Sequence, residues 1–251
     1  MLSELVPRPQ QGRVFEQVLS AGFADCAPSG RVRLDAVARW LQDVAYADVV
    51  DAEVVDRAVW LVRRTRIRVA RFPRVGEACA VATFCSGLGR MWAERRTSVS
   101  VPGSAESQIE AVTLWVHLDP ASGRPIPVGD REAFVYGPSA AGRRVTARLR
   151  HPAPSWEEPR SVWSFRATEL DIAGHINNAA YWEPLEEELL AGPELERLDV
   201  ELEYRAPAQP GDKQLLRDGT RRWIVGDARE VHASILLADV ECAFPTRRTP
   251  G

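Results

Sequence analysis

The first half of the chain combines one helical hydrophobic period with a series of strand-like segments. Leu34, Val37, Leu41 and Val44 recur at helical spacing and predict an amphipathic helix over 34–50. Elsewhere apolar positions partly alternate with polar ones, which is typical of strands that bury one face. Such strands are expected near residues 13–20, 59–71, 77–85, 91–101 and 109–118.

The second half repeats this layout. A helix is expected over 178–190, and strands are expected near 161–167, 198–206, 213–217, 221–225 and 230–243. Pro184 lies inside the predicted helix, so it should kink the helix or confine its regular part to later residues. Gly30-Arg31 takes the position that Gly174-His175 has in the second half, which indicates a divergent duplication.

A joint separates the two halves. From residue 119 to 159 the sequence is rich in Pro, Gly, Ser and Arg and lacks a sustained period, which predicts a linker with one short element. We therefore expect a first unit over 1–140, a linker over 141–159 and a second unit over 160–251. A long helix followed by antiparallel strands, twice, is an α+β arrangement in which each sheet wraps its own helix.

The composition excludes several classes of protein. With 251 residues and 45% apolar content the chain can bury a sizeable core. A net charge of −3 argues against a protein that coats nucleic acid, and no apolar run approaches the roughly 18 residues that span a bilayer. Cys26, Cys79, Cys85 and Cys242 lack zinc-ligand spacing, and no secretory signal precedes the first strand. We expect a cytoplasmic protein with reduced cysteines and no metal, cofactor, nucleic-acid partner or membrane segment.

The segment 171–178 holds the densest group of reactive side chains. Asp171, His175, Asn177 and Asn178 place a carboxylate, an imidazole and two carboxamides where a predicted strand turns into a predicted helix. Gly174 allows backbone angles that other residues avoid, and the first amides of a helix have no partner within it. A carbonyl oxygen that gains negative charge would be stabilised at such a helix start.

Hydrolysis at a carbonyl group needs an activated water and a donor for the developing oxyanion. Asp171 takes the proton of the water in one interpretation, and orients His175 to do so in the other, since an imidazole suits proton transfer near neutral pH. We favour Asp171 as base and His175 as the donor that positions the carbonyl, with the amides near Asn177 and Asn178 as oxyanion donors. In a purely structural interpretation, either Asn caps the helix and Asp171 closes a local turn.

The pattern Asp-x-x-Gly-His-x-Asn-Asn, followed by a helix with aromatic residues, resembles the active-site segment of hotdog thioesterases, most closely the acyl-acyl carrier protein (acyl-ACP) thioesterases of plants and bacteria. Segments 41–45, 60–63, 72–77, 115–116 and 203–205 are similar to other landmarks of that family, in the same order. The resemblance implies a tandem (double) hotdog, with the active site in the second unit and the acyl chain in the first. It also implies a bacterial hydrolase of fatty acid biosynthesis, with acyl-ACP as substrate.

Two departures from the family pattern bear on activity. The plant enzymes carry an Asn where this chain has Ala173, and a Glu followed by a Cys shortly after the Glu-Tyr-Arg segment, where this chain has Ala-Pro-Ala-Gln over 206–209. Gln209 is a candidate to hold a water in their place, and we expect it to bind substrate together with Gly174 and Asn178. The alternatives to an acyl-ACP thioesterase are a non-hydrolytic module that binds acyl-ACP or acyl-CoA, an acyl-CoA thioesterase and, more weakly, a hydratase or dehydratase of hotdog type.

Arginines gather on one predicted strand. Arg64, Arg66 and Arg68 share a face, and such a patch suits an acidic carrier protein or the phosphates of coenzyme A. In the simpler interpretation they form a solvated strand face. The sequence leaves open the acyl chain length, the carrier, and whether the protein is a monomeric double hotdog or a homodimer.

Overall fold

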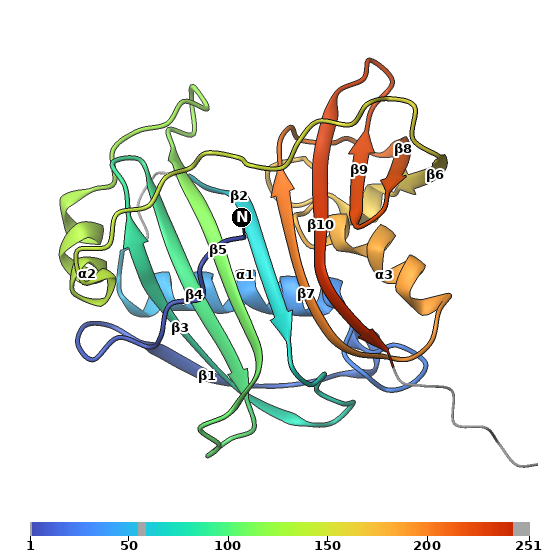
Figure 1. The fold of residues 1–251 in the computed structure, drawn as a ribbon. Coiled ribbons are helices and arrows are strands. Elements are labelled where there is room, and N and C mark those ends of the chain that lie inside the picture. Colours follow the sequence, from blue (N-terminus) through green and yellow to red (C-terminus); the bar gives the residue numbers. More distant parts are fainter. Residues whose placement is uncertain (1, 55–58, 243–251) are drawn as a thin grey trace, which may run out of the picture.

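The computed structural model describes residues 2–54 and 59–242, and its centre is one antiparallel sheet. Ten strands lie in the order β1-β3-β4-β5-β2-β7-β10-β9-β8-β6, so each half of the chain forms one half of the sheet (Figure 1). The strands are Phe15–Ser20 (β1), Val59–Val69 (β2), Ala78–Leu88 (β3), Trp92–Ser100 (β4), Ser107–Leu118 (β5), Arg160–Phe165 (β6), Leu195–Tyr204 (β7), Gly211–Asp218 (β8), Arg221–Val225 (β9) and Val231–Cys242 (β10). Every strand expected from the alternation is present, β9 with the expected ends and the others with shifted ends; Ala243 lies outside the described residues.

Two helices lie on the inner face of the sheet. α1 (Leu34–Asp51) confirms the first predicted helix, and the apolar residues that predicted it are all buried. The second predicted helix is shorter, because a 3-10 turn (Ala180–Trp182, η3) precedes α3 (Glu183–Leu190). Pro184 stands in the first turn of α3, where its missing N–H costs no hydrogen bond, so the regular helix is confined to later residues as predicted.

Three further helical elements lie in the described part of the chain. The 3-10 turns Phe23–Asp25 (η1) and Ala167–Glu169 (η2) follow the first strand of each half. α2 (Asp130–Ala140) is the short element expected between the halves, and it packs on β3 at one edge of the sheet (Figure 1). Residues 141–159 then cross the outer face towards the second half. No helix in the described part of the chain is long and apolar enough to cross a membrane.

The duplication expected from sequence is visible in the backbone. Both Gly30 and Gly174 have positive φ, +87° and +73°. Three pairs of hydrogen bonds recur, and their donor residues differ by one constant sequence offset: Gly30 N to Ala27 O and Gly174 N to Asp171 O, Val32 N to Pro73 O and Ile176 N to Ala208 O, Arg33 N to Asp25 O and Asn177 N to Glu169 O. Of the acceptors, only Pro73 and Ala208 depart from this offset. The same offset makes Arg31 correspond to His175, Leu34 to Asn178, and Gln42 to Glu186.

The two halves of the sheet join where β2 pairs with β7. On the outer face of this joint Arg64 is only 2% exposed; it donates to Ser3 Oγ and to the carbonyl of Arg148. Arg66 forms an ion pair with Asp199 at 2.6 Å. Two of the three arginines therefore belong to neither a basic docking patch nor a solvated face, because the N-terminal segment and the linker contact this surface.

Candidate active site

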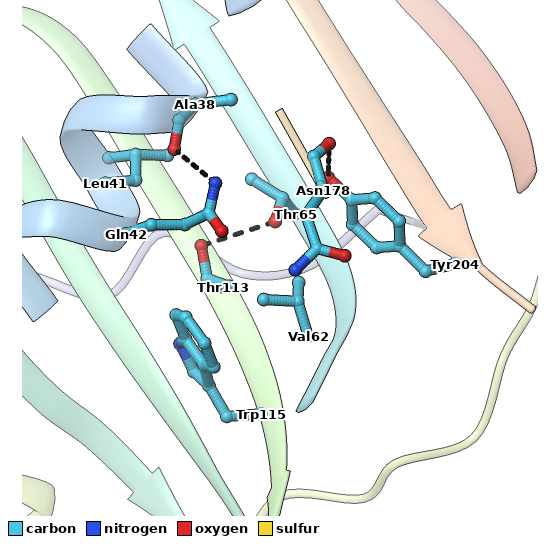
Figure 2. A pocket seen from close by; sticks show the side chains of 9 residues that line it. All are labelled: Ala38, Leu41, Gln42, Val62, Thr65, Thr113, Trp115, Asn178 and Tyr204. Atoms are coloured by element: carbon cyan, nitrogen blue, oxygen red, sulfur yellow. Dashed lines mark hydrogen bonds between the residues drawn. The ribbon is translucent and has the colours of Figure 1, made fainter. Parts of the chain in front are cut away.

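A small cavity lies between α1 and the sheet, beside the turn that precedes η3 (Figure 2). Its volume of about 10 Å³ is room for about one water molecule. Both halves of the chain line it, so it exists only in the tandem arrangement. The lining residues are Ala38, Leu41 and Gln42 of α1, Val62 and Thr65 of β2, Thr113 and Trp115 of β5, Asn178, and Tyr204 of β7.

Asn178 is the motif residue that lines this cavity, and its carboxamide points into it (Figure 2). Its carbonyl oxygen accepts a hydrogen bond from the Tyr204 hydroxyl at 3.0 Å, and that hydroxyl accepts one from Trp182 Nε1 at 3.0 Å. Burial raises the pKa of Tyr204, so its hydroxyl stays protonated and remains a donor. Within the described residues, neither the backbone N–H of Asn178 nor its carboxamide has a hydrogen-bond partner.

The corresponding position in the first copy is occupied. The N–H of Leu34 donates to Glu186 Oε2 at 3.0 Å, and Glu186 also pairs with Arg31 at 2.8 Å. In the second copy Gln42 takes the place of Glu186, and its amide donates instead to Asn177 Oδ1 at 3.1 Å. A carboxylate oxygen thus binds the helix-start amide in the first copy, while the matching amide of Asn178 is left open beside the cavity.

Asn177 performs the capping role that its residue type favours. Its Oδ1 accepts from the N–H of Ala179 at 2.8 Å as well as from Gln42, and its own N–H donates to Glu169 O at 2.8 Å. The expectation that the Asn177 amide is a free oxyanion donor is therefore wrong, because this N–H is already bonded. Of the two amides expected to act together, that of Asn178 is the open one.

Asp171 and His175 lie on the turn that leads to Asn178. Asp171 Oδ1 accepts from the N–H of Ala173 at 2.9 Å and, more weakly, from that of His175 at 3.5 Å, so it closes the local turn. The His175 ring is exposed, and the described chain offers it no hydrogen-bond partner. Gln209 donates to Gly174 O at 3.1 Å. None of these residues lines the cavity.

The same turn is tied to the chain that follows β7. Ile176 N–H donates to Ala208 O, and Ala208 N–H donates to the hydroxyl of Tyr181 at 2.8 Å. Burial, chiefly, raises the pKa of Tyr181 to about 12. Pro207, at the position of the family Glu, is exposed. The segment that carries a catalytic acid in the plant enzymes therefore serves here to hold the turn in place.

Of the residues that line the cavity, Asn178 alone was expected as a site residue. Those with polar or aromatic side chains that escaped the sequence analysis are Gln42, Thr65, Thr113, Trp115 and Tyr204. Gln42 falls in segment 41–45, which sequence marks only as a family landmark. Its place in the site follows from the duplication, since it corresponds to Glu186. Trp115 and Tyr204 likewise fall in segments 115–116 and 203–205, which sequence marks only as family landmarks. The two threonines carry no local signal, because only sheet pairing brings them together.

One described group has the spacing of metal ligands. Ligand atoms of His151, Glu201 and Glu203 lie within 4.8 Å of one another on the outer face. Glu201 accepts from the N–H of Ser3, and Glu203 accepts from Arg205 Nη2 at 3.1 Å and from the N–H groups of residues 150 and 151. Because these carboxylates already have cationic and amide partners, the group fits a buried anchor for the linker better than a metal centre.

Comparisons with known proteins agree with this architecture. Residues 12–133 match the acyl-ACP thioesterase N-terminal domain, and residues 155–218 match the acyl-ACP thioesterase C-terminal domain. An uncharacterised protein of Mycobacterium tuberculosis H37Rv is 28% identical over 241 residues, covering 93% of this chain and 95% of that protein. The chloroplastic oleoyl-acyl carrier protein thioesterase of Coriandrum sativum is 26% identical over 171 residues, covering 61% of this chain and 45% of that protein.

Solved structures show the same fold. The 12:0-ACP thioesterase from Umbellularia californica is similar with a TM-score of 0.73 at 16% identity, covering 92% of this chain and 99% of that one. An acyl-ACP thioesterase from Bacteroides thetaiotaomicron gives 0.73 at 17% identity, covering 89% and 96%. The fold is a double hotdog, and the chain belongs to the acyl-ACP thioesterase family.

Proposed function

We propose that the protein hydrolyses the thioester of acyl-ACP and releases a free fatty acid. Membership of the family supports thioester hydrolysis in general. One observation carries the proposal: the amide of Asn178 is open at the cavity, while the corresponding amide of Leu34 holds the carboxylate oxygen of Glu186. An oxyanion formed from the thioester carbonyl has the same chemistry as that carboxylate oxygen.

In the proposed reaction the thioester carbonyl oxygen accepts from the Asn178 N–H. Asp171 takes a proton from the attacking water, and His175 donates to the carbonyl from the exposed side of the turn. The water oxygen bonds to the carbonyl carbon, and the carbon–sulfur bond then breaks to release the carrier thiolate, which takes up the proton. Gln209 donates to Gly174 O, and this contact holds the turn that carries Asp171 and His175.

The carrier is proposed from the relatives that the chain resembles. The named plant relative is an acyl carrier protein thioesterase, as is the Umbellularia structure. An acyl-CoA thioesterase is the alternative. Assays of the same acyl group on ACP and on coenzyme A separate the two, and a preference for coenzyme A would overturn the carrier while leaving the hydrolase.

The first experiment is thiol release by the purified protein from a panel of acyl-ACPs, beside His175→Ala and Asp171→Asn. We expect each variant to lose about a hundredfold or more in kcat, since an acid–base group contributes that much. Ser29→Ala is the control: it changes an exposed residue of the first-copy turn, at the position that corresponds to Ala173, and should keep full activity. A fully active His175→Ala would remove His175 from the mechanism.

A second candidate function is a non-hydrolytic module that binds acyl thioesters. Two observations favour it: Ala173 offers no side-chain hydrogen bond, and Pro207 stands where the plant enzymes have a Glu. This candidate predicts saturable binding of acyl-ACP with no release of thiol. The panel described above therefore distinguishes it from the hydrolase.

A further inference from the structure

A row of polar side chains leads from the cavity into the first copy. Thr65 of β2 pairs with Thr113 of β5, and Thr113 pairs with Arg95 of β4. All three lie on the inner face of the sheet and are at most 9% exposed. The two threonine hydroxyls are 3.4 Å apart at the floor of the cavity (Figure 2). This polar row, Thr65–Thr113–Arg95, occupies the direction in which the resemblance places the acyl chain.

The far end of the row is fixed in place. Arg95 forms an ion pair with Asp48, which reaches down from α1 and is 1% exposed. Arg13 binds the same carboxylate, and the Arg95 guanidinium lies 5.3 Å from the ring centre of Tyr136 of α2. Arg95 also donates to the Thr83 hydroxyl at 3.4 Å. The space behind the cavity is therefore filled by charged and hydroxyl groups that already have partners.

The opposite direction along the sheet is also filled. The hydroxyl of Tyr204 is fixed between Trp182 and Asn178, and its ring packs edge-on against that of Tyr181 at 5.5 Å between centroids. Trp115 stands beside Thr113 and bounds a further side of the cavity (Figure 2). A long apolar chain could extend past these groups only by displacing them.

On the basis of the proposed function, we propose that the acyl site selects short acyl chains and that the polar row Thr65–Thr113–Arg95 sets the limit. A chain that passes Thr113 must separate Arg95 from Asp48 or bury methylenes against charged atoms. The cost of breaking a buried ion pair exceeds the gain from burying a few methylenes. From Thr65 to Arg95 the sheet spans two strand spacings, roughly 10 Å. A chain that opened the cavity in this direction would therefore meet Arg95 at about the length of an octanoyl group, well short of a palmitoyl group.

The test measures kcat/KM for butyryl-, octanoyl- and palmitoyl-ACP and, by calorimetry on the same protein, the binding of octanoate and palmitate. We expect octanoyl-ACP to exceed palmitoyl-ACP by about tenfold or more. The double variant Asp48→Leu/Arg95→Met removes the ion pair as a whole and should shift this ratio towards palmitoyl by about tenfold. Thr113→Val keeps the side-chain shape and should shift the ratio in the same direction by a smaller factor.

The matched control is Arg66→Met/Asp199→Leu. It removes an ion pair of the same kind from the same sheet, but on the outer face, and should leave the octanoyl to palmitoyl ratio unchanged. Should the Asp48/Arg95 double variant fail to fold, Thr113→Val and the wild-type chain-length profile decide the question. A thermal unfolding scan of each variant identifies that case.

The outcomes separate this inference from the proposed function. Palmitoyl-ACP hydrolysed as well as octanoyl-ACP would overturn the chain-length limit and leave the thioesterase standing. Release of thiol from none of the acyl-ACPs would overturn the thioesterase, and tighter binding of octanoate than palmitate would still support the limit. If no thiol is released and octanoate and palmitate bind equally well, the chain-length limit is overturned too. An unchanged ratio in folded Asp48→Leu/Arg95→Met and in Thr113→Val would also overturn the role of the polar row.

Discussion

The two copies of the hotdog turn share a backbone and differ in what the turn holds. In the first copy Arg31 is 1% exposed and binds Glu186, whose carboxylate also accepts from the first amide of α1. In the second copy His175 is exposed; Asn178 lines the cavity, and its backbone N–H, the matching amide, has no hydrogen-bond partner among the described residues. One pair of corresponding residues, Glu186 and Gln42, accounts for much of the difference.

The contrast shows how one scaffold supplies either a structural ion pair or a candidate reaction site. In the first copy the carboxylate of Glu186, neutralised by the buried Arg31 guanidinium, occupies the helix-start amide of Leu34. A neutral carboxamide leaves the second helix start with its uncompensated positive partial charge. Such a site favours an oxygen that gains charge in a transition state over a neutral carbonyl, which is the condition for catalysis.

The largest expected effect comes from removing the carboxylate of Glu186 that is bound at the first-copy turn. Glu186→Gln removes the carboxylate that lies 2.8 Å from Arg31 and leaves this buried guanidinium only the more distant carboxylate of Glu194, at 4.0 Å. The free energy of unfolding should therefore fall by about 3 kcal/mol. Urea denaturation measures this. The exposed neighbour variant Glu187→Gln should change stability by under about 0.5 kcal/mol. Replacing both partners, Arg31→Met/Glu186→Leu, should recover most of the loss, and equal losses in the single and double variants would contradict the ion-pair account.

The reverse experiment places a carboxylate at the second-copy turn. Gln42→Glu gives the second copy the carboxylate of the first, which should accept from the Asn178 N–H and compete with the oxyanion. We expect kcat for thiol release to fall about a hundredfold, close to the effect of removing one oxyanion donor. Gln42→Leu also loses the bond to Asn177 but adds no carboxylate, so its loss should be clearly smaller. Equal losses would mean that Gln42 acts only by holding Asn177.

The periodicity of the sequence was sufficient to predict the helices and strands, but not the long-range contacts that distinguish the two turns. The ten strands, α1, and a second helix that begins only at Glu183 with Pro184 in its first turn all follow from local pattern. The contact of Leu34 with Glu186 spans 152 residues and that of Gln42 with Asn177 spans 135, so no local signal reports either one. Arg64 likewise looks exposed in an alternating strand, and only its contacts with Ser3 and Arg148 bury it.

A second pair of corresponding positions gives a pH-dependent contrast. Arg39 pairs with Asp25 at 2.9 Å in the first copy, whereas the second copy has Glu183 and Glu169 at these positions. Burial first, then the charges of Glu169 and Asp35, raise the pKa of Glu183 to about 7, against the opposing charges of two arginines, at 166 and 33. The folded protein therefore binds this proton more tightly than the unfolded chain does.

This linkage fixes the sign of the effect. The stability associated with protonated Glu183 is present at low pH and is lost as pH rises from about 4.5 to about 7. Glu183→Gln should remove that loss, so the variant should be more stable than the wild type by about 2 kcal/mol at pH 8 after allowance for partial exposure. Urea denaturation between pH 5 and pH 8 tests it. If the plots of unfolding free energy against pH run parallel for the wild type and Glu183→Gln, then Glu183 does not bind the proton that causes the pH dependence.

The smallest expected effect restores a family residue to the turn. Ala173→Asn adds a carboxamide where the plant enzymes have one, and one new hydrogen bond to the substrate or to Asp171 should raise kcat by up to about tenfold. The matched control is Ser29→Asn, because Ser29 holds the corresponding exposed position of the first turn. No rise at 173 would mean that this chain does not use that position in its reaction. A rise at 173 with none at 29 would show that two turns with the same backbone differ in function, because only the second leaves its helix-start amide open to substrate.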